Sequence, residues 1–158
     1  MRIRYIEKAD NKKIAATIRK VIIEMGASKT GTTYKDEELD AMFEAYEKER
    51  FIYFVIENGK QIFWGAGIAP LKNGDPLICK LQKMYFLPEA RGKGFGNQMI
   101  HRYIDFAKVS NFKQCYIETM PNMQDAQKLY TKTGFKYIDH SFGNTGHCSC
   151  SIWMLKTF

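Results

Sequence analysis

The sequence predicts a single α+β domain, covering residues 1–158, that is built on a mixed sheet. The length of 158 residues and the apolar content of 45% match one ordinary globular core. Apolar residues recur at both helical and strand spacing, which gives the expected order βααβββαβαββ. Two hairpin-type connections and two strand–helix–strand crossovers imply a largely antiparallel mixed sheet, which excludes a doubly wound parallel one.

The N-terminal part is expected to contain one strand and two helices. Residues 3–6 form the strand, and Asp10 is the expected N-cap of a helix with apolar residues at helical spacing that ends at Gly26. Residues 27–34 are rich in Thr and Gly, which indicates a polar loop. Residues 36–48 again carry apolar side chains on one helical face, so a second helix is predicted there.

Three strands follow in the middle of the chain. Residues 51–56 and 61–70 are rich in β-branched and aromatic residues, and Asn58-Gly59 between them is a strong hairpin signal. Residues 77–87 form the next expected strand, which ends at Pro88. Along this strand neither face is consistently apolar, which indicates a register break such as a β-bulge.

The last part of the chain alternates helices and strands. A glycine-rich turn precedes an amphipathic helix, and residues 115–120 form a strand after it. Residues 122–133 predict a short helix that is closed by Gly134 at its C-terminus. Residues 135–138 and 149–155 are the final two strands, and the alternation places Cys148 and Cys150 on one face of the last strand.

Charge and cysteine content limit the classes of function. The net charge of +7 favours anionic partners, but no nucleic-acid-binding motif is present, so a nucleic-acid partner is supported by charge alone. The four cysteines have no zinc-ligand spacing, so we expect reduced thiols and no metal. No apolar run is long enough to span a membrane, and the N-terminus lacks a signal-peptide pattern. We therefore expect a cytoplasmic protein with neither a membrane nor a nucleic-acid partner.

The stretch between the third central strand and the next helix is the most informative part of the sequence. It reads Arg91, Gly92, Lys93, Gly94, Phe95, Gly96, Asn97. Closely spaced glycines expose successive backbone N–H groups, and the N-terminus of a helix adds partial positive charge. Together with two cations, these features predict a pyrophosphate site. The stretch is neither a P-loop nor a dinucleotide fingerprint, because the Ser/Thr and the third glycine that these motifs require are absent.

These residues resemble a known family. The segment 91–96 matches the Arg/Gln-x-x-Gly-x-Gly/Ala signature of the GNAT superfamily of N-acetyltransferases. Downstream, Ala126, Leu129, Tyr130, Gly134 and Phe135 resemble its second signature at the expected spacing. The resemblance covers nearly the whole chain, and two blocks at the correct separation are a much stronger signal than the glycine motif alone.

The resemblance implies a fold with helices on both faces of the sheet and with the fourth and fifth strands splayed apart. It also implies acetyl-CoA as donor, no metal, and a primary amine of a small molecule as acceptor, in a direct transfer within a ternary complex. The implied cofactor-binding residues are Met84, Tyr85, Phe86, Arg91, Gly92, Lys93, Gly94, Phe95, Gly96, Asn97 and Asn122. Many family members place an asparagine at the position of Met123 instead, one residue after Asn122.

The resemblance also implies catalytic residues. Tyr130 matches the tyrosine that protonates the departing thiolate of coenzyme A, and a phenol suits this role because its pKa near 10 exceeds that of a thiol near 8.5. The strand over residues 77–87 lacks the glutamate that many relatives carry, and Lys80 stands near that place. Glu118 is therefore the preferred general base, and His147 is a second candidate. A packed aromatic for Tyr130 and an ion-paired carboxylate for Glu118 are the structural alternatives.

Three alternatives for the function stay open at this point. The acceptor can be a protein N-terminus or lysine instead of a small amine. The chain can be a non-catalytic acyl-CoA-binding regulator, or a basic nucleic-acid-binding domain. The sequence is compatible with a homodimer.

Overall fold

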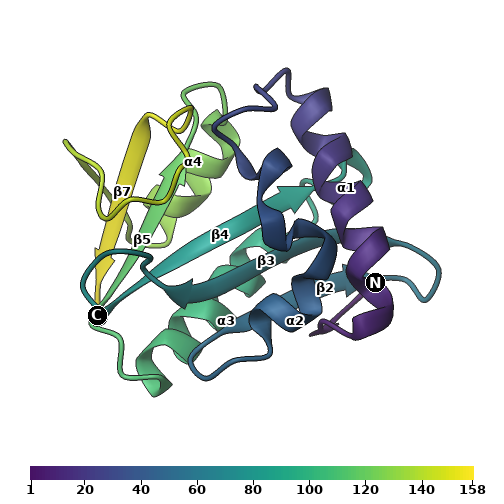
Figure 1. Ribbon diagram of the computed structural model, residues 1–158, viewed down its shortest axis with the longest axis horizontal. Helices are drawn as coiled ribbons and strands as arrows, with labels where there is room; N and C mark the ends of the chain where they lie inside the picture. The colour runs from purple at the N-terminus through teal and green to yellow at the C-terminus, as the bar shows by residue number, and fades with distance from the viewer.

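Seven strands form one sheet in the order β1-β2-β3-β4-β5-β7-β6, as the computed structural model of residues 1–158 shows (Figure 1). Every pair of neighbouring strands is antiparallel except β4 and β5, which are parallel. This arrangement confirms the mixed, largely antiparallel sheet. The strands are β1 (Arg2–Tyr5), β2 (Ile52–Glu57), β3 (Ile62–Pro70), β4 (Ile78–Phe86), β5 (Gln114–Thr119), β6 (Lys136–Ile138) and β7 (Ile152–Thr157).

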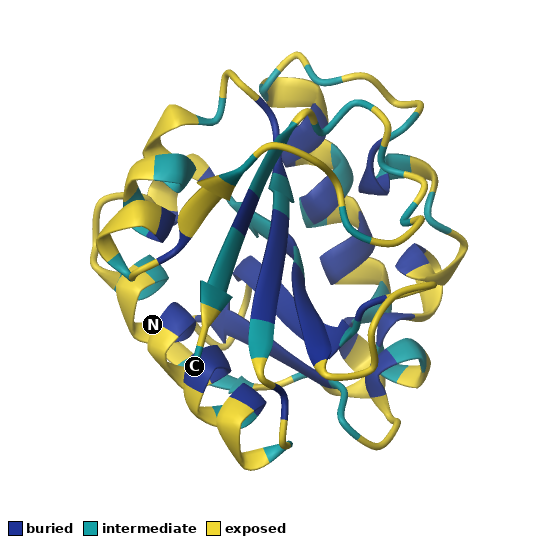
Figure 2. Ribbon diagram, turned by 90° about the vertical axis from the view of Figure 1, so that its left-hand side faces the viewer, coloured by how far each residue is buried: buried dark blue, intermediate teal, exposed yellow.

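Helices cover both faces of the sheet, as predicted (Figures 1 and 2). On one face, α1 (Asn11–Glu24) and α2 (Met42–Tyr46) share an apolar cluster with β2 and β3. On the other face, α3 (Phe95–Val109) and α4 (Gln124–Lys132) pack against the central strands. Because both faces are covered, all of β2 and nearly all of β3 are buried, and these two strands lie at the centre of the core (Figure 2).

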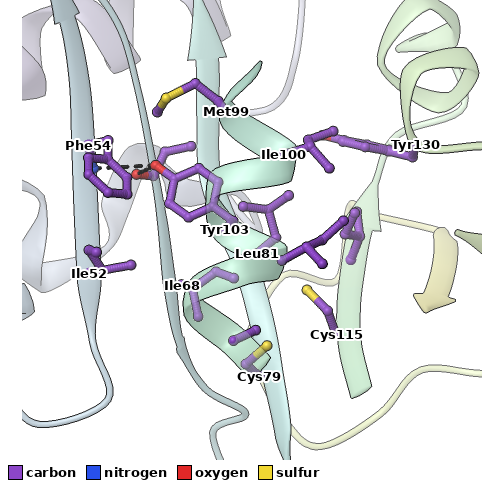
Figure 3. Packing of buried hydrophobic residues seen from close by; sticks show 14 of the residues in the cluster. Ile52, Phe54, Ile68, Cys79, Leu81, Met99, Ile100, Tyr103, Cys115 and Tyr130 are labelled. Carbon is purple, nitrogen blue, oxygen red and sulfur yellow. Dashed lines mark hydrogen bonds between the residues drawn. The ribbon is translucent and has the colours of Figure 1, made fainter. Parts of the chain in front are cut away.

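The larger core lies between the sheet and α3. Tyr103 of α3 is buried within it, and its hydroxyl donates to the carbonyl of Ala66 and lies 3.3 Å from the N–H of Phe54 (Figure 3). Tyr130 of α4 reaches the edge of the same cluster. Burying a large apolar side chain contributes about 1.5–3 kcal/mol, so this core fixes the position of β4 relative to both helices.

The helix predicted over residues 36–48 is wrong as a continuous element. A 3-10 helix (Glu37–Ala41) comes first and α2 starts only at Met42, because Ala41 leaves helical geometry with φ −134° and ψ 46°. The side-chain oxygen of Asn11 accepts from the N–H of Phe43 at 2.8 Å. This N–H lies in the first turn of α2 and has no acceptor within the helix, so a side chain from α1 supplies one. The apolar face itself was correctly identified, since Leu39 and Met42 are fully buried.

Two smaller predictions are also corrected. Asp10 does precede α1 directly, but its carboxylate makes no capping bond to that helix. It accepts instead from the N–H of Glu7 at 2.8 Å and from Arg4 at 2.7 Å. Cys148 and Cys150 do not lie on a strand, because β7 begins only at Ile152 and a turn occupies the preceding residues. All four cysteines are free thiols.

Gly65 of β3 leaves space for the ring of Tyr53. A Cβ at residue 65 would lie 2.7 Å from Cζ of that ring, which is fully buried and cannot move away freely. We expect Gly65→Ala to lower the free energy of unfolding by about 1–3 kcal/mol, as overpacking does, measured by urea unfolding. In a Tyr53→Leu background the same substitution should cost much less, because the ring is gone. Equal costs in both backgrounds would contradict this explanation.

Candidate active site

The central feature of the site is a fork between β4 and β5. The two strands pair only from Ile78 opposite Gln114 to Leu81 opposite Ile117, although β4 continues to Phe86. In Figure 1 they start side by side and then diverge. This observation confirms the predicted splay of the fourth and fifth strands.

A β-bulge at Lys83 produces the divergence. The register between β3 and β4 shifts between Gly65 and Gly67, and Lys83 adopts a left-handed backbone with φ +55°. The hydroxyl of Tyr53 lies 3.3 Å from the carbonyl oxygen of Lys83 and donates to it. A bulge bends its strand and leaves one residue out of the ladder. The register break that the sequence indicated for this strand is therefore confirmed.

A cavity occupies the fork, and residues from both strands line it. Met84 and Tyr85 reach it from β4, Glu118 reaches it from β5, and Tyr130 reaches it from α4. The hydroxyl of Tyr130 donates to the sulfur of Met84 at 3.5 Å. Burial raises the pKa of the Tyr130 phenol well above its usual range, so the hydroxyl keeps its proton at neutral pH.

The glycine-rich turn before α3 leaves a run of backbone donors free. No backbone carbonyl accepts from the N–H groups of residues 92–97. Gly92 and Gly94 have positive φ values of 72° and 78°, and a Cβ at either would meet nothing within 4 Å. Gly96 differs, because a Cβ there would lie 2.7 Å from Leu129 of α4. The turn and the helix N-terminus thus present donors to open space, which is the geometry of an anion site.

Several residues that were predicted to bind the cofactor have other partners. The guanidinium of Arg91 donates to the carbonyl of Phe86 at 2.9 Å and pairs with Glu24 at 3.0 Å, so it braces the end of β4. The Phe86 ring stacks on Trp64 with 3.8 Å between ring centroids. Asn122 donates to the carbonyl of Met25 at 3.3 Å and does not line the fork cavity, whereas Met123 does. Lys93 and Asn97 are exposed at the turn.

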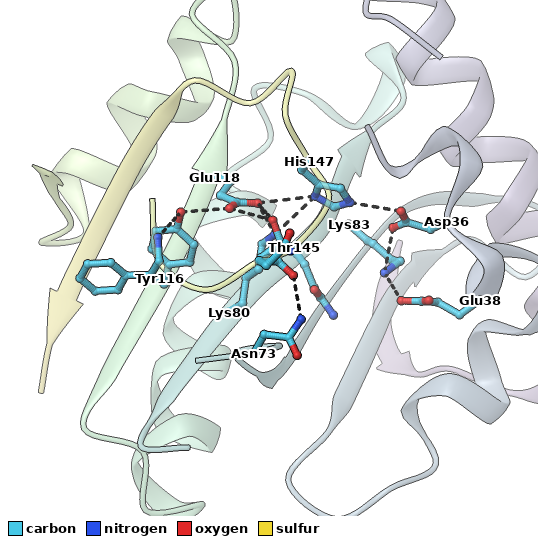
Figure 4. Close-up of polar contacts among 12 residues, drawn as sticks. Asp36, Glu38, Asn73, Lys80, Lys83, Tyr116, Glu118, Thr145 and His147 are labelled. Atoms are coloured by element: carbon cyan, nitrogen blue, oxygen red, sulfur yellow. Dashed lines mark hydrogen bonds and ion pairs between the residues drawn. The ribbon is translucent and has the colours of Figure 1, made fainter. Parts of the chain in front are cut away.

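Glu118 stands at the mouth of the fork with its carboxylate fully engaged (Figure 4). It forms a buried ion pair with Lys80 of β4, and it accepts from Tyr116 at 3.0 Å and from Thr145 at 2.7 Å. Burial lowers the pKa of Lys80, and the charge and hydrogen bond of Glu118 counteract this effect only in part. Lys80, which the sequence placed near the position where many relatives carry a glutamate, is thus the ion-pair partner of Glu118, the preferred base.

A second group of charged residues continues from this pair. Lys83 at the bulge pairs with Glu38 at 2.9 Å and with Asp36 at 3.3 Å, and its side chain is only 1% exposed. Asp36 also lies 3.2 Å from Nε2 of His147, whose Nδ1 is 3.3 Å from the Lys80 ammonium (Figure 4). Sequence reasoning missed Asp36 and Glu38, since nothing local marks them. The bulge signal in β4 could have pointed to Lys83.

A cavity of about 180 Å³ adjoins the fork on the side of the loop before β7. Its lining includes Thr145, Ser141 and Trp153. It shares Glu118, His147 and Cys150 with the fork cavity, so the two spaces meet at these three residues. The site therefore has two connected cavities, one inside the fork and one beside the loop before β7.

The comparison with known families agrees with this architecture. The profile described as "Acetyltransferase (GNAT) family" matches residues 20–135. The chain therefore belongs to the GNAT acetyltransferase family, and the family resemblance seen in the sequence is confirmed.

Individual relatives are consistent with this assignment. The uncharacterized N-acetyltransferase YjgM of Escherichia coli (strain K12) is 40% identical over 148 residues, which cover 93% of this chain and 89% of the relative. This relationship confirms the predicted enzyme class, an N-acetyltransferase.

Solved structures show the same fold at low identity. A GNAT-family acetyltransferase from Staphylococcus aureus Mu50 superposes with a TM-score of 0.84 at 18% identity, covering 99% of this chain and 98% of the other. The yncA protein from Salmonella typhimurium, determined with its cofactor acetyl-CoA, has a TM-score of 0.78 at 19% identity, covering 99% and 93%.

Two kinds of feature are absent from the structure. No group of three or more His, Cys, Asp or Glu side chains is arranged to hold a metal ion. No helix combines the length and the apolar character needed to cross a bilayer.

The pairing of Lys83 with carboxylates gives a prediction for acid conditions. Burial alone would raise the pKa of Glu38, but the charge and hydrogen bond of Lys83 outweigh it and hold the pKa below its usual value. A carboxylate with a lowered pKa stabilises the fold above its ordinary pKa of about 4.3, and this contribution is lost as the pH falls through the folded value. We expect the free energy of unfolding of Glu38→Gln to fall less steeply between about pH 5 and pH 3.

The exposed neighbour Glu37 provides a matched control for this measurement. Glu37→Gln changes the net charge equally but removes no ion pair of Lys83. If both variants show the same pH dependence in urea unfolding, the Lys83 pair does not contribute to acid sensitivity.

Proposed function

We propose that the chain transfers an acetyl group from acetyl-CoA to the primary amine of a small molecule, by direct attack while both substrates are bound. The observation that carries the proposal is the open fork between β4 and β5 beside a run of unpaired backbone donors at the start of α3. A strand gap and an anion site in direct succession suit a long ligand with a phosphate end and an amide-containing arm. Acetyl-CoA has this form, and when bound it supplies the acetyl thioester.

The turn before α3 is proposed to hold the pyrophosphate. The N–H groups of residues 92–97, the partial positive charge of the helix and the exposed Lys93 all favour an anion. Gly92 and Gly94 let the backbone approach the ligand, since no side chain stands between. Arg91 contributes indirectly in this arrangement, because it fixes the carbonyl of Phe86 at the end of β4.

The fork is proposed to hold the pantetheine arm and the reacting thioester. Beyond Leu81 no backbone group of β4 pairs with β5, which leaves the edge of residues 84–86 available to amide groups of the ligand. The phenol of Tyr130 lies in this cavity with its proton retained. We assign to it the donation of a proton to the departing sulfur, because the phenol stays protonated at neutral pH and lies in the cavity proposed for the thioester.

The amine is proposed to approach from the cavity lined by Thr145 and Trp153. Its size of about 180 Å³ suits a small molecule, and Glu118 stands where this cavity meets the fork. Glu118 attracts the ammonium form of the acceptor, and it is one of two candidates for the base, with His147 as the other. A peptide acceptor and a non-catalytic acyl-CoA-binding role are outcomes that the experiments below separate. The cytoplasmic location and the homodimer stay predictions.

Binding of acetyl-CoA is tested by the shift of the thermal midpoint. At 100 times the dissociation constant, the ligand should add about 2.7 kcal/mol of stability and raise the midpoint by several degrees. Asn97→Glu should abolish the shift, because a carboxylate in the first turn of α3 repels the pyrophosphate while stabilising the free helix. The neutral control Asn97→Gln should keep the shift. No shift in the wild-type chain at millimolar acetyl-CoA would overturn the donor assignment.

Acid catalysis by Tyr130 is tested by thiol release from acetyl-CoA across a panel of polyamines, amino sugars, amino acids and arylalkylamines. We expect Tyr130→Phe to lower kcat by about 100-fold or more, with the acetyl-CoA-induced thermal shift retained. The exposed Tyr137 is the matched control, and Tyr137→Phe should leave kcat unchanged. Unchanged turnover in Tyr130→Phe would remove Tyr130 from the mechanism. Binding of acetyl-CoA without transfer to any amine or peptide would favour the regulator.

A further inference from the structure

We propose that His147 accepts the first proton of the acceptor amine and that Asp36 is the positioning residue that holds its imidazole ready. The inference rests on the proposed function and adds a residue pair to it. Neither local sequence nor the family signatures bring residues 36 and 147 together; only the fold places them at the same end of the fork (Figure 4).

The hydrogen bonds of the ring define its tautomer. Nε2 lies 3.2 Å from a carboxylate oxygen of Asp36, which can only accept, so Nε2 carries the proton. Nδ1 lies 3.3 Å from the ammonium of Lys80, which can only donate, so Nδ1 carries the lone pair. A carboxylate behind one ring nitrogen and a lone pair on the other is the arrangement that prepares a histidine to accept a proton.

The position of the ring suits an incoming amine. The side chain is 11% exposed, and it lines both the fork cavity and the cavity by which the amine is proposed to enter. The Lys80 ammonium lies between the Glu118 carboxylate and His147 Nδ1, so this corner of the site already accommodates an alkylammonium group. The ammonium group of a substrate that arrives beside Lys80 can therefore donate to the same two groups, the Glu118 carboxylate and His147 Nδ1.

Glu118 alone is poorly placed to do this work. Its oxygens already accept from Lys80, Tyr116 and Thr145, and its carboxylate lies 3.7 Å from His147 Nδ1. These three donors already occupy the carboxylate oxygens that would have to accept the proton of the amine. In the proposed division, Glu118 stabilises the ammonium and the imidazolium electrostatically, and His147 takes the proton.

The proton balance is complete without another reactant. The acceptor ammonium transfers one proton to Nδ1, which gives an imidazolium whose Nε2 proton stays on the ring and is hydrogen-bonded to Asp36. The nitrogen lone pair is then free to attack the thioester carbon. The carbon–nitrogen bond forms, the carbon–sulfur bond breaks, and Tyr130 gives its proton to the sulfur. The second proton leaves the nitrogen as the amide forms and restores the phenol of Tyr130 through water. His147 returns its proton to water through the outer cavity.

Charged and titratable groups face His147 from every neighbouring element. Asp36 approaches from the segment before the 3-10 helix, Lys80 from β4 and Glu118 from β5. Cys150 lies in the loop before β7, as His147 does, and it lines both cavities. Lys83 acts at one remove, through Asp36. Asp36→Asn therefore changes one contact of the ring and leaves those with Lys80 and Glu118 in place.

The first test needs no substrate. The chain has only three histidines, so the ¹⁵N resonances of His147 can be assigned by comparison with His147→Gln. We expect the neutral ring of the wild-type protein to carry its proton on Nε2 and its lone pair on Nδ1. Asp36→Asn should shift the population toward the other tautomer, because an amide no longer requires a donor from Nε2. A wild-type ring with its proton on Nδ1 would overturn the proposal.

The second test uses the pH profile of kcat/KM with the fastest amine of the panel. His147→Gln should reduce kcat/KM by about 100-fold at pH 7, and the deficit should shrink toward pH 10, where the amine loses its proton unaided. Asp36→Asn should show the same profile with a smaller loss.

Glu38→Gln is the matched control, since Glu38 shares Lys83 with Asp36 but does not touch His147. In Glu38→Gln, kcat/KM should depend on pH as it does in the wild-type chain.

The outcomes separate this inference from the proposed function. A wild-type chain that neither binds acetyl-CoA nor acetylates any amine refutes the proposed function itself. An active wild-type chain in which His147→Gln loses equally at every pH assigns the residue a structural role and refutes the inference. Equal losses in Asp36→Asn and Glu38→Gln would refute the positioning role of Asp36.

Discussion

The left-handed backbone of Lys83 is the constraint on which the site depends. A residue with a side chain rarely adopts a φ near +55°, and this conformation costs about 1–2 kcal/mol. The surroundings hold it in place, because Tyr53 donates to its carbonyl and two carboxylates bind its ammonium. Without the bulge, β4 would continue alongside β5 and the edge of residues 84–86 would be consumed by sheet pairing. The fork is therefore open because hydrogen bonds and ion pairs hold the strained Lys83 at both its backbone carbonyl and its side chain.

The two buried lysines of β4 show how the charges around the fork are balanced. Burial lowers the pKa of Lys80, and its single carboxylate partner does not fully compensate. Burial acts in the same direction on Lys83, but Tyr46, Asp36 and Glu38 together raise its pKa above the usual value. Lys83 is thus a fixed cation that serves the fold. Lys80 is the more weakly held charge, and it contacts Glu118 and His147, which line both cavities.

The features that were predictable from the sequence are those that short segments determine. Three such features act through local backbone geometry, and each appeared where expected: the glycines of residues 92–96, the alternation along β4 and the Asn58-Gly59 hairpin. The helix over residues 36–48 was wrong because tertiary contacts override its propensity: Asp36 and Glu38 turn toward Lys83, and Asn11 binds the backbone at Phe43.

The polar network could not be predicted, since its members come from segments far apart in the chain. His147 and Asp36 are separated by 111 positions, and Glu118 and Thr145 by 27. Alternation also misplaced Cys148 and Cys150 on a strand, because a polar loop with two regularly spaced cysteines has the same pattern as an exposed strand. Single-sequence patterns carry no information on which polar side chains meet across a sheet.

The loop before β7 is organised by side chains instead of secondary structure, and this explains how its histidine can be held in one orientation. The N–H of Phe142 donates to Tyr116, Asn73 donates to the carbonyl of Asn144, and Thr145 donates to Glu118. Each bond connects the loop to the sheet or to the β3–β4 loop, so its shape is set before any ligand binds. Asp36 then links this loop to the bulge, since it contacts both His147 and Lys83. One carboxylate thereby sets the distance between the opened strand and the residues on the acceptor side, which is the relation that a direct transfer between two bound substrates requires.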